Sequence, residues 1–301
     1  MNRTRSIFAF FIVLYVFVTA FASCNKFKGD QEIPAYIHVD TFLLSTNYAF
    51  EGAASHKITD VWLYIDGNVM GCYEMPATIP VLERGEHELI LIPGIKLNGN
   101  SSTRTINPFY KPYEIESFVL KEGVVDTILP TTRYYTEEES TIKFRYMEDF
   151  ERQISLEESD NSDTTIIRTD RDDPNIWNDA EGNSHYSGYV WLGDTTTFFY
   201  VKSDEEFRDL PDQGDNVFLE IDYKCTGVFK VGLLARTSGY EQIDLIYVNP
   251  SPIWNKIYIN LGPNITDYQS ASYFEFFITA TLEDAQEAEY YFDNIKLVYR
   301  D

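Results

Sequence analysis

Short runs of alternating apolar and polar residues, separated by turn residues, constrain the fold of this chain more than any other feature. In "NVFLEIDYKC" (216–225), Val217, Leu219, Ile221 and Tyr223 fall on one side of an extended backbone. Similar runs recur about every ten residues towards the C-terminus, without a regular alternation of helices and strands. The aromatic fraction of 16% also favours strands. These patterns predict an all-β chain and exclude a parallel α/β sheet.

The first residues have the layout of a secretory signal. Arg3 and Arg5 precede an apolar run, residues 7–18, that is shorter than the roughly 20 residues of a membrane-spanning helix. The following "FASC" (21–24) resembles a bacterial lipobox, although that box usually begins with Leu. The resemblance implies cleavage before Cys24 and attachment of lipid, such as palmitate, to Cys24. A plain secreted protein and an uncleaved anchor are the alternatives.

The residues after this cysteine bear on localisation. Asn25 stands where Asp would favour the inner membrane in proteobacterial sorting, so we expect a lipid-anchored protein of the outer membrane. Export to the surface of Bacteroidota-type bacteria is associated with acidic residues directly after the cysteine. Here Asp30 and Glu32 come only later, so the periplasmic face and the cell surface both stay open.

Charge and composition narrow the range of partners. The net charge of -24 repels nucleic-acid phosphates and anionic lipid surfaces, so we expect neither as a partner. Cys72 and Cys225 form no Cys-x-x-Cys pair, and the four histidines lack metal-ligand spacing. We therefore expect no disulfide framework, no metal site and no cofactor.

The first half of the mature chain carries a spaced set of turn residues: Asp66-Gly67, Gly71, Pro76-Ala77 and Gly85-Glu86-His87. Asp-Gly is a strong two-residue hairpin signal because both central positions need a positive φ. The order resembles the PEGA-type domain, over about residues 58–130. The resemblance implies a small immunoglobulin-like β-sandwich without catalytic residues, in which His87 is a structural partner at the start of a strand.

A long polar insertion, residues 96–116, interrupts this module. It contains Phe109, Tyr110 and Tyr113, which could stack on a partner as a recognition loop or cover the edge of the sandwich.

An acidic stretch, residues 157–183, opens the second half. Its carboxylates could hold calcium, but their spacing does not fit the Asp-x-Asp-x-Asp-Gly loop, so a solvated loop is the expectation. Trp177 within it either packs on the sandwich or faces a ligand.

Two later groups, Trp254-Asn255-Lys256 and Asp293-Asn294-Ile295, lie within segments that have the pattern of β-strands. They resemble the jelly-roll of carbohydrate-binding modules and galactose-binding-like domains, over about residues 141–301. In such a fold we expect Asp293 to be a structural hydrogen-bond acceptor rather than a calcium ligand, and Trp254 to belong to the core rather than to a binding platform.

The predicted organisation is two tandem β-sandwich domains behind a lipoprotein signal. The segments are 1–23 signal peptide, 24–34 tether, 35–135 PEGA-like or immunoglobulin-like sandwich, 136–140 charged linker, and 141–301 jelly-roll.

The sequence contains no Gly-x-Ser-x-Gly, His-Glu-x-x-His or phosphate-loop motif, so we expect no enzyme. A structural or protein-interaction role in an envelope assembly ranks first, because it needs no identified site. The alternative is a glycan-binding surface lipoprotein of a polysaccharide-utilisation system. Its candidate ligand-binding residues are Trp177, Tyr186, Tyr189 and Trp191, because aromatic rings stack on sugars.

Overall fold

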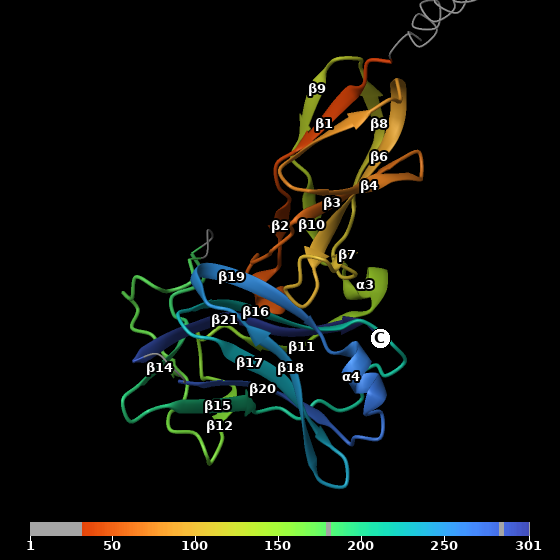
Figure 1. The fold of residues 1–301 in the computed structure, drawn as a ribbon. Coiled ribbons are helices and arrows are strands. Elements are labelled where there is room, and N and C mark those ends of the chain that lie inside the picture. Colours follow the sequence, from red (N-terminus) through yellow and green to blue (C-terminus); the bar gives the residue numbers. More distant parts are fainter. Residues whose placement is uncertain (1–31, 179–181, 283–285, 301) are drawn as a thin grey trace, which may run out of the picture.

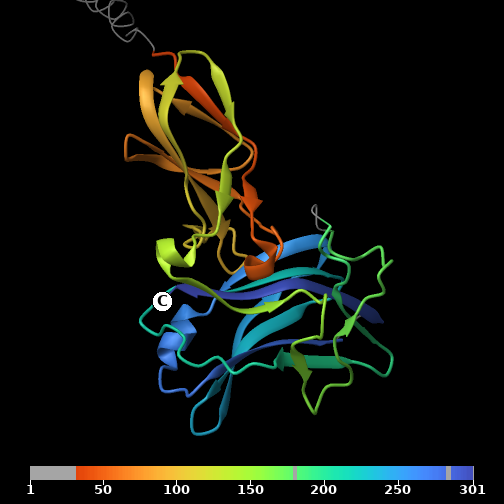
Figure 2. The same ribbon diagram turned by 180° about the vertical axis from the view of Figure 1, so that it is seen from behind.

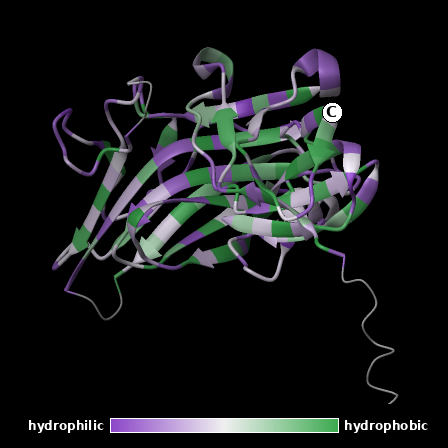
Figure 3. Cartoon of the chain, turned by 90° about the horizontal axis from the view of Figure 1, so that it is seen from above, coloured by the Kyte–Doolittle hydropathy of each residue, from purple (hydrophilic) through white to green (hydrophobic). Residues whose placement is uncertain are grey.

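The chain folds into two β-sandwich domains, as the sequence predicts. The computed structural model describes residues 32–178, 182–282 and 286–300, and the predicted signal peptide and Cys24 lie outside them. Hydrophobic and hydrophilic residues alternate along the strands (Figure 3). No helix in the described part of the chain has both the length and the apolar character needed to cross a membrane.

The first domain contains three small sheets. One has the order β5-β1-β9, the second pairs β10 with β2, and the third has the order β4-β3-β6-β7 with β8 also on β6. The elements are β1 (Ala35–Val39), β2 (Leu43–Ser45), α2 (Tyr48–Glu51), β3 (Asp60–Ile65), β4 (Asn68–Glu74), β5 (Ala77–Val81), β6 (Gly85–Lys96), β7 (Arg104–Ile106), β8 (Tyr113–Leu120), β9 (Val125–Ile128) and β10 (Thr131–Arg133).

The second domain is a jelly-roll of two packed sheets. One has the order β13-β14-β21-β16-β19, with β11 also on β21, and the other has the order β12-β15-β20-β17-β18. The elements are β11 (Ile142–Glu148), β12 (Leu156–Glu158), β13 (Ile167–Arg168), β14 (Gly188–Gly193), β15 (Phe198–Ser203), β16 (Val217–Cys225), β17 (Phe229–Arg236), β18 (Tyr240–Val248), β19 (Ser251–Asn260), α4 (Gly262–Asp267), β20 (Phe274–Thr281) and β21 (Glu287–Arg300).

The residues predicted as a linker, 136–140, adopt a defined structure. Residues Glu137–Ser140 form the short helix α3, whose N-cap Thr136 makes a capping box with Glu139. Glu139 also pairs with Arg133 and Lys111, both at 2.7 Å. The chain therefore passes between the domains through a segment that is fixed by side-chain contacts.

The first domain stands on the outer face of the sheet that contains β16, β19 and β21 (Figures 1 and 2). Its hydrophobic core continues across the boundary, because Ile142, Phe218, Tyr258 and Val298 of the second domain belong to the same buried cluster. The sheet with β15, β17, β18 and β20 lies on the far side of the jelly-roll from the first domain (Figure 1).

The insertion at 96–116 supplies part of this contact. Phe109 is fully buried, and its ring meets that of Phe218 edge-on, with 5.1 Å between centroids. The hydroxyl oxygens of Tyr110 and Tyr258 lie 3.3 Å apart, and the Asn98 N–H donates to the Tyr258 carbonyl. Phe109 and Tyr110 of the insertion thus lie between the domains, a position that neither predicted role describes.

Charged side chains are also buried at this boundary. Lys256 Nζ lies 3.2 Å from Glu220 Oε2 and 3.5 Å from Asp222 Oδ1. Lys296 Nζ donates to the carbonyl oxygen of Ala53 in the first domain, at 2.9 Å. Burial, reinforced by the charge of Lys256, lowers the pKa of Lys296 to about 8.

Candidate ligand-binding groove

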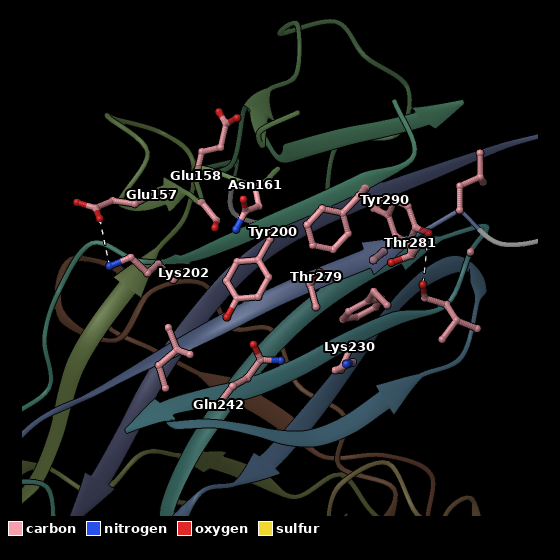
Figure 4. A pocket seen from close by; sticks show the side chains of 18 of the residues that line it. Glu157, Glu158, Asn161, Tyr200, Lys202, Lys230, Gln242, Thr279, Thr281 and Tyr290 are labelled. Carbon is pink, nitrogen blue, oxygen red and sulfur yellow. Dashed lines mark hydrogen bonds and ion pairs between the residues drawn. The ribbon is translucent and has the colours of Figure 1, made fainter. Parts of the chain in front are cut away.

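A groove of about 1270 Å³ crosses the outer face of the β12-β15-β20-β17-β18 sheet. It faces away from the first domain, and Figure 4 shows the side chains that project into it. Its lining includes Glu157, Glu158, Asp160, Asn161, Phe198, Tyr200, Lys202, Lys230, Leu234, Tyr240, Gln242, Tyr247, Glu275, Thr279, Thr281 and Tyr290.

Strand register places these side chains in rows across the sheet. Tyr200 lies opposite Thr279, which lies opposite Lys230, which in turn lies opposite Tyr247. Each of these strands sends its alternate residues, such as Phe199 and Val231, into the core of the jelly-roll. The groove is therefore the outer side of strands whose inner side holds the domain together.

An aromatic pair, of which Tyr200 borders the groove, supports part of its floor. The rings of Tyr200 and Phe277 are stacked, with centroids 5.0 Å apart and an angle of 15° between their planes. Phe277 is fully buried, whereas Tyr200 is half-buried and borders the groove. Gly232 leaves room for Phe277, because a Cβ at position 232 would lie 2.2 Å from the Phe277 ring.

The charged residues of the floor are paired. Lys202 Nζ lies 2.5 Å from Glu275 Oε1 and 3.4 Å from Glu157 Oε2. Burial opposes the charged form of Lys202, but the two carboxylates outweigh it and raise the pKa of this lysine. Lys230 Nζ lies 2.7 Å from Asp244 Oδ2. Both lysines lining the groove are therefore held as ammonium groups beside carboxylates.

Two exposed tyrosines stand on the β18 side. Tyr247 is 64% exposed and Tyr240 is 56% exposed. The Lys230 ammonium lies 5.2 Å from the Tyr247 ring centroid, and the Arg236 guanidinium lies 4.5 Å from that of Tyr240. The Tyr240 hydroxyl also lies 2.8 Å from that of Tyr273. These contacts hold the two rings in place while leaving much of their surface open to a ligand.

The four residues that the sequence singled out for ligand binding lie elsewhere. Tyr189 and Trp191 are on β14 in the opposite sheet, and Trp177 and Tyr186 precede that strand. Trp191 is 39% exposed, while the other three are half-buried. The Arg168 guanidinium lies 4.4 Å from the Tyr186 ring. The structure describes all four residues, and none of them lines the groove. Their role in ligand binding stays a prediction.

The structure also gives the roles of Asp293 and Trp254. Asp293 is fully buried and accepts hydrogen bonds from the Ser187 hydroxyl at 2.6 Å and the Asn294 N–H at 2.7 Å. This confirms it as a structural acceptor. Trp254 is half-buried and belongs to neither hydrophobic core cluster of the described residues, so the expectation that it is a core residue is wrong; its indole N–H donates to the Asn175 carbonyl at 2.9 Å.

The acidic stretch forms short strands and turns rather than one loop. It contains the end of β12 and all of β13, and residues 179–181 of it lie outside the described part. Within the described ranges, no group of three or more His, Cys, Asp or Glu side chains is arranged to hold a metal ion.

The groove residues carried a signal in the sequence. In "TTTFFYVK" (195–202), Phe199 and Val201 supply an apolar inner face, yet Phe198 and Tyr200 on the outer face are aromatic as well. A strand that is aromatic on both faces indicates that the outer face contacts something other than water. The partner strands β17, β18 and β20 come far later in the chain, and local pattern does not pair them with it.

Comparisons with known proteins give likenesses in fold only. No family model matches the chain, and no curated protein matches it. Among solved structures, one is 14% identical in sequence to this chain. It comes from work on the promiscuous specificity of carbohydrate-binding modules of the β-sandwich superfamily. It covers 79% of this chain and 84% of its own, with a TM-score of 0.37.

Two further structures are similar to about half of the chain. A carbohydrate-binding module specific for non-crystalline cellulose, CBM28, is 14% identical and covers 50% of this chain and 90% of its own, with a TM-score of 0.34. A family 11 carbohydrate-binding module from Clostridium thermocellum, solved with a β-1,3-1,4-mixed-linked tetrasaccharide, is 16% identical and covers 50% of this chain and 93% of its own, also with a TM-score of 0.34.

Proposed function

We propose that this protein is a non-catalytic glycan-binding protein and that the groove on the β12-β15-β20-β17-β18 sheet holds a segment of a polysaccharide chain. The observation that carries the proposal is the combination of exposed tyrosines with ordered polar groups in one open groove. Tyr240 and Tyr247 are more than half exposed, and Gln242 and Thr279 line the same groove. At the level of sequence a structural role ranked first only because no site was identified.

The chemistry of the groove matches that of sugars. A pyranose ring has an apolar face of C–H groups that packs against an aromatic ring, while its hydroxyl groups both donate and accept hydrogen bonds. Tyr200, backed by Phe277, and the rim residue Tyr247 offer such ring faces. The amide of Gln242 can donate and accept, whereas the hydroxyl of Thr279, which donates to the Phe199 carbonyl at 2.7 Å, can accept a hydrogen bond from a sugar. An open groove with these groups suits an extended chain rather than a small enclosed ligand.

The arrangement of carboxylates supports binding without hydrolysis. Glycoside hydrolysis requires one carboxyl group that donates a proton and a second that acts as a base or nucleophile. In the groove Glu157 and Glu275 both lie beside the Lys202 ammonium, which acts as their shared ion-pair partner. Incubation with a polysaccharide that binds should therefore release no new reducing ends.

We place the protein at a bacterial envelope, anchored through lipid on Cys24. The described chain enters the first domain at the end farthest from the jelly-roll, and the sheet that carries the groove lies on the opposite side of the jelly-roll (Figure 1). An anchored protein with this arrangement would present its groove away from the membrane. Metabolic labelling with a fatty-acid analogue, compared between the parent and Cys24→Ala, tests the anchor.

The test of glycan binding is affinity electrophoresis against a panel of soluble polysaccharides, followed by calorimetry on those that retard the protein. Tyr247→Ala should weaken binding roughly tenfold or more, since truncation of an aromatic contact commonly has such an effect. Phe50→Ala, which removes an exposed aromatic ring of the first domain, is the matched control and should leave affinity unchanged.

Trp191→Ala distinguishes the groove from the face that the sequence singled out. Unchanged affinity in Trp191→Ala together with a loss in Tyr247→Ala supports the groove. The reverse pattern would move the site to the β14 side. If no polysaccharide of a broad panel retards the parent protein, the proposal fails.

A further inference from the structure

The charges that line the groove are unbalanced. Acidic side chains come from Glu157, Glu158, Asp160 and Glu275, while Lys202 and Lys230 are the basic side chains among the described lining residues. Lys202 pairs with Glu275 and Glu157, and Lys230 pairs with Asp244. An anionic group that enters the described groove therefore meets only lysines that already have a carboxylate partner.

Glu275 is the most buried of these acidic side chains. It is 3% exposed at the floor of the groove, and one of its oxygens, Oε2, has no hydrogen-bond partner in the described structure. A charge that is shielded from water acts at lower effective dielectric and is screened less by salt than an exposed charge. Among the residues that the structure describes, its ion-pair partner is Lys202, which Glu157 shares.

We infer that the groove selects uncharged polysaccharide chains and rejects polyuronates and sulfated chains, with Glu275 as the residue that sets this selectivity. The inference rests on the proposed function. An anionic sugar above the floor would lie close to Glu275 and to the exposed carboxylates of Glu158 and Asp160. The electrostatic potential around the protein is negative as well, because the whole chain carries a net charge of -24.

The experiment compares two forms of one polymer. A neutral polysaccharide that the protein binds is oxidised at its primary alcohols to carboxylates, which adds charge and leaves the backbone intact. At low salt the neutral form should bind about tenfold more tightly or better, and added salt should narrow the difference.

Glu275→Gln keeps the shape of the side chain and removes its charge. In this variant the preference for the neutral form should fall severalfold, because Lys202 loses one carboxylate and the floor loses its buried charge. Glu116→Gln, an exposed charge change on β8 of the first domain, is the matched control and should keep the full preference. Glu158→Lys reverses an exposed charge of the groove and should also reduce the preference, without depending on a buried substitution.

The outcomes separate the two proposals. Equal or tighter binding of the oxidised form overturns the selectivity while leaving glycan binding intact. The same preference in Glu275→Gln, Glu158→Lys and Glu116→Gln overturns the role of the groove charges. Binding of neither form overturns the proposed function itself, and the selectivity with it.

Discussion

Lys256 and Glu220 form a buried ion pair, with 3.2 Å between Nζ and Oε2, on a sheet face that the first domain covers. The Tyr134 hydroxyl of the first domain donates to the same carboxylate at 3.1 Å. Burial alone would lower the pKa of Lys256, but the carboxylates of Asp222 and Glu220 raise it above its usual value. The contact between the domains therefore depends on charges that lose their water when the domains pack.

Lys256→Met should strongly destabilise the protein. It leaves Glu220 and Asp222 buried without their cation, and breaking such a pair typically costs about 3–5 kcal/mol in the free energy of unfolding. Chemical denaturation measures the loss, and Lys121→Met, at an exposed position, is the control. Adding Glu220→Gln to Lys256→Met should recover part of the loss. Equal stability of Lys256→Met and Lys121→Met would show that the pair contributes little.

Phe109→Ala tests the insertion as a contact between domains. Phe109 is fully buried against Phe218, and truncation of a buried Phe typically costs about 3–5 kcal/mol. Hydrogen exchange should become faster along β16 and β19, which the first domain would then cover less tightly. Tyr113→Ala, at a half-buried position of the same insertion, serves for comparison. Unchanged exchange in β16 and β19 would contradict this role of the insertion.

Local pattern predicted the elements of the fold but not what covers them. The alternation in β16 separates Leu219 and Ile221, which face the core, from Glu220 and Asp222 on the other side. These two carboxylates are buried because the first domain packs on that face. That contact joins residues far apart in the chain, such as Tyr134 and Glu220, which are 86 positions apart, so no local periodicity predicts it.

The candidate site shows the same limit. Tyr200 and Tyr247 belong to different strands of the sheet that carries the groove, separated in the chain by β16 and β17. Their place in one groove follows from the order of strands in the jelly-roll, whereas Trp177 and Trp191 were predicted because they lie in or near the acidic stretch of the sequence. By contrast, the turn at Asp66-Gly67 is a local feature and was predicted correctly, with φ of 48° and 76°.

His87, predicted as a structural partner, contacts the same turn. Its Nδ1 lies 2.6 Å from Asp66 Oδ2, and its Nε2 lies 3.0 Å from the Arg84 carbonyl oxygen. The hydrogen bond with Asp66 raises the pKa of His87, and the same bond lowers the pKa of Asp66. The contribution of His87 to stability is therefore full below its unfolded pKa of about 6.5 and is lost as the pH rises through its raised folded pKa.

Titration by NMR of the His87 ring should accordingly give a pKa above 6.5 in the parent and a value closer to 6.5 in Asp66→Asn. Asn tolerates the left-handed backbone at position 66, so the turn is kept. Glu122→Gln removes a carboxylate that pairs with Arg84 instead and should leave the His87 titration nearly unchanged. A parent value at or below 6.5 would refute the hydrogen bond.

Gly232→Ala should damage the domain and the groove together. A Cβ at this position would lie 2.2 Å from the Phe277 ring and 2.4 Å from the carbonyl oxygen of Ile243, and that oxygen belongs to the backbone of the neighbouring strand. Overpacking of this kind typically costs about 1–3 kcal/mol. Phe277 would have to shift, and Tyr200, stacked on it, would shift with it.

Denaturation and polysaccharide affinity, measured on the same preparations, test this prediction. Gly239→Ala is the matched control, because a Cβ there meets nothing within 4 Å and its φ is not positive. We expect Gly232→Ala to lose both stability and affinity, and Gly239→Ala to lose little of either. Full affinity in a destabilised Gly232→Ala protein would mean that the stacked pair supports the sheet but does not shape the groove.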